Sequence, residues 1–115
     1  MKALLDAGAA VILQPDAAVC GGITEFQRIA FTEDSYGVAV SPHWFHDLHV
    51  HLVAATPNAA FVEFFPDDQV LNFRTLLDRQ LEFTPEGTLK LPTGPGLGFG
   101  FDHGAVERFA VDSWA

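Results

Sequence analysis

Short apolar runs alternate with helix-like segments over the first 65 residues of the chain. The runs AAVILQPD (9–16), VAVSPH (38–43) and AAFVEFF (59–65) predict short buried strands. Between them, residues 23–37 and 45–58 carry apolar side chains at helical spacing. The order strand, helix, strand, helix, strand is typical of α/β folds, whose parallel strands are joined by right-handed crossovers. The sequence therefore predicts three parallel strands with two helices.

The character of the sequence changes after Pro66. Residues 67–80 are polar with an amphipathic end, and LEFTPEGTLKLP (81–92) predicts a hairpin that turns at Pro85-Glu86-Gly87. The glycine-rich stretch 93–104 lacks the Gly-Lys-Ser/Thr ending of a phosphate-binding loop, so we interpret it as a structural turn. Residues 105–111 predict a final short strand.

Charge and cysteine content exclude several classes of function. The chain has 6 basic and 15 acidic residues and a net charge of −9. Such a surface repels phosphate backbones and anionic lipid, so we expect neither nucleic acid nor a membrane as partner. The single cysteine, Cys20, cannot form an internal disulfide. No apolar run is long enough to span a bilayer, and we expect a cytoplasmic protein.

Each predicted strand has an ionisable residue at or near its C-terminal end: Asp16, His43 and Glu63. They are 27 and 20 residues apart, so we expect them on neighbouring strands that face a common cleft. An Asp–His dyad fixes the imidazole tautomer and leaves the other ring nitrogen free to exchange a proton near neutral pH. Glu63 lies among apolar residues, where a carboxyl group favours its neutral form.

Each of these three residues also has a purely structural interpretation. Asp16 could cap the loop after its strand. His43 could be a hydrogen-bonded histidine at the rim of the sheet, and Glu63 could be a paired surface carboxylate. Together, on three consecutive strand ends, they point to an active site.

Three further histidines follow His43 within eight residues: His46, His49 and His51. His46 and His49 are three residues apart and share a helix face at a spacing that metal ligands can use. No His-Glu-x-x-His motif is present, so we assign these three histidines to the helix alone. A histidine metal site remains the alternative.

With these residues placed, the chain resembles the C-terminal portion of the enolase superfamily, in its mandelate racemase/muconate lactonising branch. The stretches that carry the resemblance are ILQPDAAVCGGITEF, AVSPHWFHDLHVHLVAATPN, AFVEFFP and GTLKLPTGPGLGFGFD. The histidine-rich pattern is more similar to the acid-sugar dehydratases of this branch than to its racemases. The resemblance implies the last three units of a modified TIM barrel, (β/α)7β, over residues 1–65. Residues 66–115 would be a hairpin and loop segment that returns to the capping domain.

The resemblance also implies roles for the three candidate residues. Asp16 and His43 match the acid/base dyad of the family, and Glu63 matches the glutamate that hydrogen-bonds the substrate carboxylate. The family reaction removes the proton α to a carboxylate, forms an enediolate with Mg²⁺ bound, and in dehydratases then eliminates water. The family's metal-binding carboxylates and its Lys-x-Lys base lie on earlier strands, and no residue of this chain matches them.

Three functions follow from the resemblance. The chain would be the C-terminal portion of an acid-sugar dehydratase, inactive until it is joined by the missing N-terminal part or by further copies of itself. It could instead belong to a racemase or epimerase of the same superfamily. A third interpretation is a stand-alone, non-catalytic barrel fragment that serves as a scaffold or as part of an oligomer.

Overall fold

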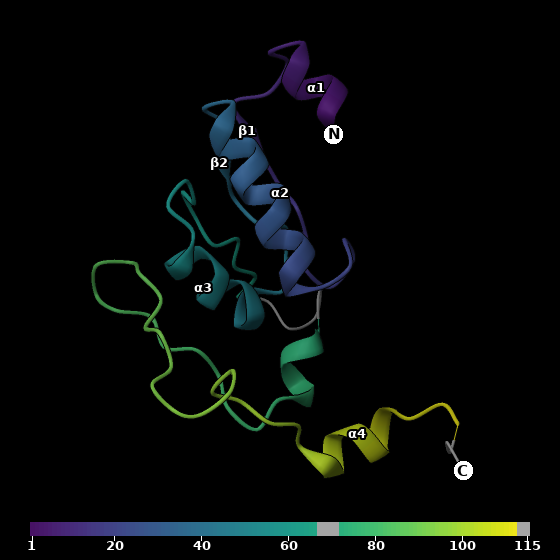
Figure 1. Ribbon diagram of the computed structural model, residues 1–115. Coiled ribbons are helices and arrows are strands. Elements are labelled where there is room, and N and C mark those ends of the chain that lie inside the picture. The colour runs from purple at the N-terminus through teal and green to yellow at the C-terminus, as the bar shows by residue number, and fades with distance from the viewer. Residues whose placement is uncertain (67–71, 113–115) are drawn as a thin grey trace. The chain divides into compact units, whose positions relative to one another are not determined.

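The computed structural model describes residues 1–66 and 72–112 and divides into two compact units, Met1–Phe64 and Phe65–Ala115. Figure 1 shows helices and a short sheet in the first unit, and loops with two short helices in the second. Across the described residues, no helix has both the length and the apolar character needed to cross a membrane.

A short parallel sheet organises the first unit. Strand β1 (Ile12–Leu13) pairs with β2 (Ala39–Val40), so that Ile12 lies opposite Ala39 and Leu13 opposite Val40. On the other side of β2, Ala59 forms a parallel bridge with Val40. The predicted parallel arrangement of three segments is therefore confirmed.

The strands are shorter than the sequence predicts, and residues 59–65 do not form a regular strand beyond the bridge at Ala59. One physical reason why the first two strands are short is that a proline follows each of them. Pro15 and Pro42 carry no backbone N–H, so neither can donate a hydrogen bond to a neighbouring strand. Isolated bonds continue past the strands, including Ser41 N–H to the Leu13 carbonyl oxygen at 3.0 Å.

Both predicted helices are present. Helix α2 (Ile23–Ser35) packs against β2 and buries Phe26, Ala30 and Glu33. Gly37 follows it with φ of +68°, a left-handed conformation that glycine adopts without steric cost and that ends many helices. Helix α3 (His46–Ala55) buries most of its residues.

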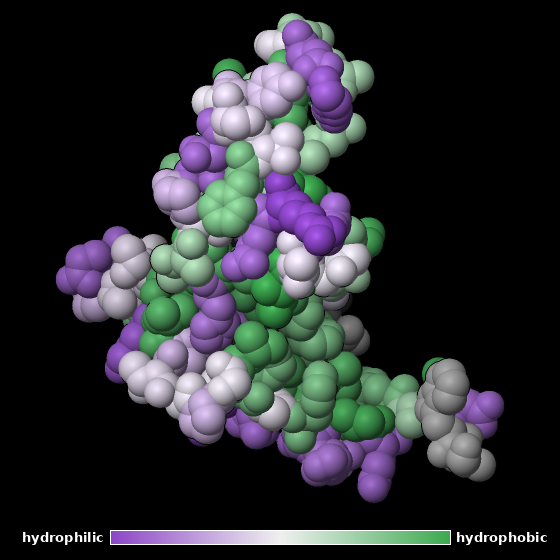
Figure 2. Space-filling model, in the orientation of Figure 1, coloured by the Kyte–Doolittle hydropathy of each residue, from purple (hydrophilic) through white to green (hydrophobic). Residues whose placement is uncertain are grey.

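Apolar side chains of β2, α2 and α3 form the core of the first unit. A short helix that the sequence analysis did not predict, α1 (Lys2–Asp6), contributes Leu5. The surface is also partly apolar, and green patches interrupt the polar covering in Figure 2. Val11 and Val19 are each 81% exposed and Phe61 is 67% exposed. Much apolar area in the first unit is therefore open to solvent.

The second unit contains the predicted hairpin and a helix where a strand was predicted. Phe83 and Leu89 form an antiparallel bridge across the turn. The predicted strand at 105–111 is wrong, because residues His103–Phe109 form helix α4. Asp102 accepts the Ala105 N–H at 3.0 Å and so caps this helix. The remaining element is a 3-10 helix at Asn72–Leu76, and residues 67–71 of the predicted amphipathic segment lie outside the described part.

Candidate functional site

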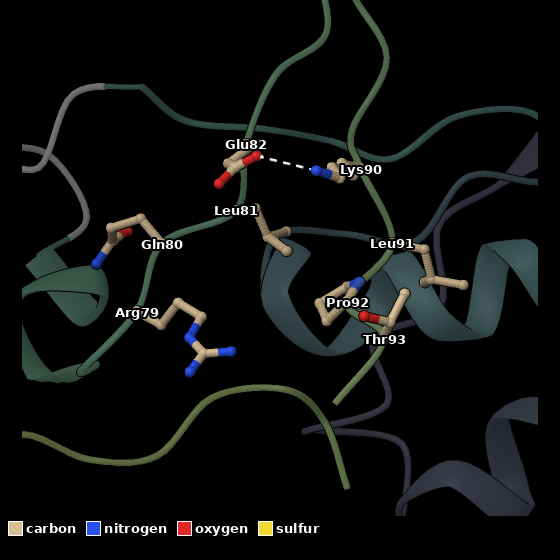
Figure 3. A pocket seen from close by; sticks show the side chains of 8 residues that line it. All are labelled: Arg79, Gln80, Leu81, Glu82, Lys90, Leu91, Pro92 and Thr93. Carbon is tan, nitrogen blue, oxygen red and sulfur yellow. Dashed lines mark hydrogen bonds and ion pairs between the residues drawn. The ribbon is translucent and has the colours of Figure 1, made fainter. Parts of the chain in front are cut away.

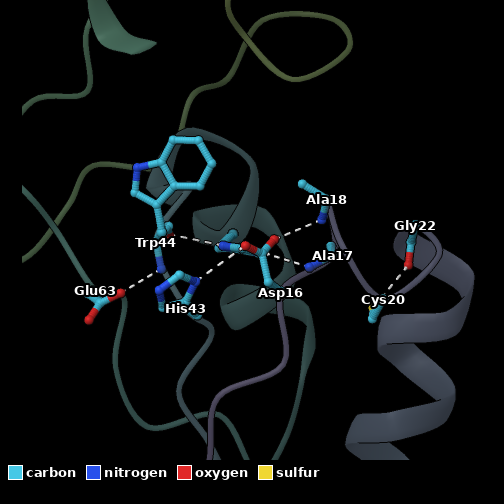
Figure 4. Close-up of polar contacts among 9 residues, drawn as sticks. Asp16, Ala17, Ala18, Cys20, Gly22, His43, Trp44 and Glu63 are labelled. Atoms are coloured by element: carbon cyan, nitrogen blue, oxygen red, sulfur yellow. Dashed lines mark hydrogen bonds and ion pairs between the residues drawn. The ribbon is translucent and has the colours of Figure 1, made fainter. Parts of the chain in front are cut away.

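Asp16 and His43 lie together at the ends of β1 and β2. The Nδ1 atom of His43 is 3.4 Å from Oδ2 of Asp16. Figure 4 draws this contact as a dashed line between the two side chains. The Asp16 side chain is 8% exposed, whereas the His43 side chain is 59% exposed. A buried carboxylate therefore stands behind an imidazole that is open to solvent.

The loop after β1 holds the Asp16 carboxylate. Its Oδ1 atom accepts the Ala18 N–H at 2.8 Å, and the Asp16 carbonyl oxygen accepts the Cys20 N–H at 2.8 Å. Asp16 thus closes its own loop, as the structural interpretation suggested, and still presents Oδ2 to His43. Because a carboxylate only accepts hydrogen bonds, the pairing places the proton of a neutral His43 on Nδ1.

Glu63 reaches the backbone next to His43. Its Oε2 atom accepts the Trp44 N–H at 2.6 Å, and Figure 4 shows the other carboxyl oxygen pointing away from this bond. Trp44 has φ of +53°, which lies in the left-handed region that favours glycine. Strained backbone of this kind occurs at functional sites when the surrounding contacts hold it in place.

A hollow of about 440 Å³ adjoins the dyad. Its lining residues are Gln14, Asp16, Val19, Cys20, His43 and Trp44. Burial raises the pKa of the Cys20 thiol above its usual value, so this group stays protonated and is a poor nucleophile. The lining also includes an exposed imidazole beside a buried carboxylate, an arrangement that can exchange a proton near neutral pH.

Sequence reasoning missed the contacts of His49, which is fully buried. Its Nε2 atom accepts the Ala17 N–H at 3.0 Å, and its Nδ1 atom lies 3.1 Å from the Trp44 carbonyl oxygen. Burial lowers the pKa of His49, outweighing the Trp44 carbonyl and the Asp16 charge, which act to raise it. The sequence signal is weak, because His49 and His51 both lie among apolar residues and the sequence does not show which of them is buried and needs hydrogen-bond partners.

The other histidines of α3 behave as helix residues. His46 is buried, its Nε2 atom is 3.2 Å from Asp47 Oδ2, and its ring centroid is 4.3 Å from that of Phe64. His51 is half-buried. The prediction that His49 belongs to the helix alone is wrong, because its ring joins two loops.

The described residues do not fit a magnesium ion. Among residues 1–66 and 72–112, no group of three His, Cys, Asp or Glu side chains could hold a metal. Both oxygens of Asp16 contact protein groups, and one oxygen of Glu63 is taken by the Trp44 N–H. Mg²⁺ prefers octahedral oxygen ligation, which this set does not offer.

A second hollow lies in the hairpin of the second unit, with a volume of about 150 Å³. Figure 3 shows its lining: Arg79, Gln80, Leu81, Glu82, Lys90, Leu91, Pro92 and Thr93. Its one drawn ion pair, Lys90 with Glu82 at 3.5 Å, is largely exposed. Exposed pairs contribute little free energy, and none of the predicted site residues lies here.

Comparison with known proteins identifies relatives over nearly the whole chain. Residues 1–105 match the family model described as enolase C-terminal domain-like. The chain is 33% identical to D-galactarolactone cycloisomerase of Agrobacterium fabrum, over 93% of this chain and 31% of that protein. It is 36% identical to L-rhamnonate dehydratase of Saccharopolyspora erythraea, over 84% of this chain and 26% of that protein.

Solved structures give the same result. The L-talarate dehydratase of Polaromonas sp. JS666, complexed with Mg and L-glucarate, superposes with a TM-score of 0.80 at 35% identity. The match covers 92% of this chain and 28% of that one. The L-talarate/galactarate dehydratase of Salmonella typhimurium LT2, liganded with Mg and L-lyxarohydroxamate, gives 0.79 at 32% identity. This chain thus spans less than a third of the length of the relatives it matches.

Proposed function

The chain belongs to the enolase superfamily, in its mandelate racemase/muconate lactonising branch, and we propose that it forms the C-terminal part of an acid-sugar dehydratase. In this proposal residues 1–65 are the last three units of a (β/α)7β barrel. Residues 66–115 return to the capping domain. Similarity to dehydratases in both the sequence and the structure comparisons supports the reaction class.

The observation that carries the proposal is the Asp16–His43 pair. The carboxylate holds the imidazole with Nδ1 protonated, so Nε2 is the nitrogen that exchanges a proton with the substrate. A base in another part of the assembled enzyme would first take the proton α to the substrate carboxylate. With Nε2 protonated, His43 then gives its proton to the β-hydroxyl, which leaves as water, and the buried Asp16 carboxylate stabilises the imidazolium before transfer. The high exposure of the His43 ring supports its access to substrate.

Glu63 holds the substrate carboxylate in this scheme. Two carboxylates at hydrogen-bond distance repel each other, so Glu63 must carry a proton on the oxygen that faces the substrate. Its Oε2 atom is already an acceptor for the Trp44 N–H, which leaves Oε1 for this role. The same bond ties the Glu63 carboxyl group to the residue that follows His43.

Magnesium belongs to the proposal through the relatives, whose structures are complexed with Mg. The described residues of this chain do not form its cage, so the ion would be held by another part of the assembled enzyme. Asp16, His43 and Glu63 are assigned to proton transfer and substrate binding alone.

The sheet supports the need for a further part. In the described residues β1 pairs on one side only, with β2, and Val11 and Ile12 at this edge are 81% and 45% exposed. An open parallel edge with exposed apolar side chains favours pairing with another strand. We propose that the N-terminal part of the enzyme covers it. Pairing with a second copy is the alternative, and it would correspond to a non-catalytic oligomer part.

The test is a fused protein in which this chain replaces the matching C-terminal part of the Polaromonas L-talarate dehydratase. Aldonic and aldaric acids, including L-glucarate, are incubated with it, and products are identified by NMR. The proposal predicts keto acids, and their loss in His43→Asn. A folded fused protein that binds Mg²⁺ but forms no keto acid contradicts it.

The same product analysis decides the runner-up function. Similarity to a cycloisomerase favours an isomerisation as the second candidate. Epimerised acids or rearranged lactones without keto acid would assign the chain to a racemase, epimerase or cycloisomerase. The Asp16–His43 pair would then move a proton without loss of water.

A further inference from the structure

We propose that His49 is a positioning residue that holds the Asp16–His43 pair in register. This inference rests on the proposed function of that pair and adds a residue to it. His49 is fully buried, does not line the hollow, and contacts the loops that carry both members of the pair.

The two contacts of His49 are matched. Its Nε2 atom accepts the N–H of Ala17, the residue after Asp16, at 3.0 Å. Its Nδ1 atom is 3.1 Å from the carbonyl oxygen of Trp44, the residue after His43. Ala17 N–H can only donate and a carbonyl can only accept, so His49 is neutral with its proton on Nδ1. One ring therefore links the backbone next to both residues of the pair.

Packing fixes the orientation of the ring. Phe26 of α2 lies against it with ring centroids 5.9 Å apart, and Phe45 meets it edge-on at 6.3 Å. A phenyl ring could fill this space. It would leave the Ala17 N–H and the Trp44 carbonyl without the hydrogen bonds that His49 supplies, and both loops would be free to move apart.

The neutral state of His49 also matters for charge. Its Nε2 atom is 3.6 Å from Asp16 Oδ1. A proton there would abolish the bond from Ala17 and would make His49 a competitor of His43 for the Asp16 carboxylate. The buried, neutral ring leaves that negative charge to His43.

The test uses ¹⁵N NMR on the 115-residue chain, which reports the tautomer of each histidine without any enzyme assay. In the wild type, His49 is expected with Nδ1 protonated and Nε2 bare across neutral pH. Where the His43 ring is neutral, it is expected to be mainly the tautomer with the proton on Nδ1. If His49 carries its proton on Nε2, or on both nitrogens, the proposal is overturned.

The decisive variant is His49→Phe. In this variant the His43 ring should shift toward the tautomer with the proton on Nε2. The shift should be as large as in Asp16→Asn, which lacks the carboxylate charge. The matched control is His51→Phe, the same change two residues further along α3, which should leave His43 unchanged. If His49→Phe leaves the His43 tautomer as in wild type, His49 has no positioning role.

Two milder variants keep the test decisive if His49→Phe does not fold. In His49→Gln the amide oxygen can still accept the Ala17 N–H, and in His49→Asn the amide N–H₂ can still donate to Trp44. Each should give a tautomer ratio of His43 between those of wild type and Asp16→Asn. An unchanged ratio in both overturns the role. Absence of activity in the fused protein, with these tautomers as expected, would remove the proposed function and leave the positioning role intact.

Discussion

The imidazole of His43 lies 3.4 Å from the carboxylate of Asp16, although the two residues are 27 positions apart in the chain. The pairing arises because β1 and β2 are adjacent and parallel, so that the residues following them meet at one edge of the sheet. The exposure of the two side chains differs widely, at 59% and 8%. The pair therefore has one member for the substrate and one that supports it.

Removing the Asp16 carboxylate should remove most of the proton transfer. In the fused protein, Asp16→Asn is expected to lower kcat by about 10²–10⁴-fold, the usual contribution of a general acid/base, with a much smaller change in KM. Asp16→Glu keeps the negative charge but displaces it, so its kcat should lie between those of wild type and Asp16→Asn. Equal kcat values for wild type and Asp16→Asn would exclude a dyad.

Glu63 should be replaceable by a residue that donates a hydrogen bond. Glu63→Gln keeps an acceptor for the Trp44 N–H and an N–H₂ donor for a substrate carboxylate, so KM should stay within a few-fold of wild type. Glu63→Leu loses both and should raise KM by about tenfold or more, since a hydrogen bond to a charged group contributes roughly 1.5–3 kcal/mol. Steady-state kinetics on the same acid separates the two variants. Similar KM values for Glu63→Gln and Glu63→Leu would show that Glu63 does not bind the substrate.

The Asp16–His43 pair could be predicted because each residue directly follows a strand that the sequence reveals on its own. A strand that ends in Asp and a neighbouring one that ends in His place both residues by topology alone, and the helix at 23–37 was predicted from its spacing. The role of His49 depends on contacts with Ala17 and Trp44, which no spacing within α3 reveals. Helix α4 was missed because its apolar residues also fit the pattern of a strand. The hydrogen bond from the Ala105 N–H to the Asp102 side chain caps this segment and favours the helix.

Glu33 gives the first unit a distinctive response to pH. Its side chain is fully buried on α2, and neither carboxyl oxygen has a hydrogen-bond partner among the described residues. Burial raises its pKa from 4.5 to about 7. Between these values the folded chain holds a proton that the unfolded chain has lost, so the free energy of unfolding falls as pH rises through this window.

Replacing Glu33 should remove this pH dependence. From pH 4.5 to 7, wild type should lose roughly 2–3 kcal/mol more stability than Glu33→Gln, because one pKa unit corresponds to about 1.4 kcal/mol. Urea unfolding at several pH values measures the difference. Asp34→Asn, an exposed neighbour on the same helix, is the control and should parallel wild type. If the free energy of unfolding depends on pH in the same way in Glu33→Gln and in wild type, the raised pKa of Glu33 is contradicted.

Gly98 should tolerate no side chain. It has φ of +76°, and a Cβ atom there would overlap the Cβ atom of Pro92. Gly98→Ala is therefore expected to destabilise the second unit by about 1–3 kcal/mol, a typical cost of overpacking. Gly94→Ala is the control, since a Cβ atom at Gly94 meets nothing within 4 Å.

Amide hydrogen exchange measures this effect where the second unit is held together. The Asp78 N–H bonds to the Gly100 carbonyl oxygen at 3.0 Å, and the Asp102 N–H bonds to that of Leu76 at 2.8 Å. Both amides should exchange faster in Gly98→Ala and at the wild-type rate in Gly94→Ala. Unchanged exchange in Gly98→Ala would mean that the loop can move away from Pro92 at little cost.

The role proposed for His43, with Asp16 behind it, is proton exchange with a bound sugar acid. Its most direct test is incubation of the fused protein with L-glucarate and Mg²⁺ in D₂O, followed by ¹H NMR of the remaining substrate and the products. Wild type is expected to form keto acid with one solvent deuterium at the carbon that lost the β-hydroxyl, next to the new keto group. His43→Asn is expected to lose about 10²–10⁴-fold of this rate at unchanged Mg²⁺ affinity. Equal rates for the two proteins would contradict the claim.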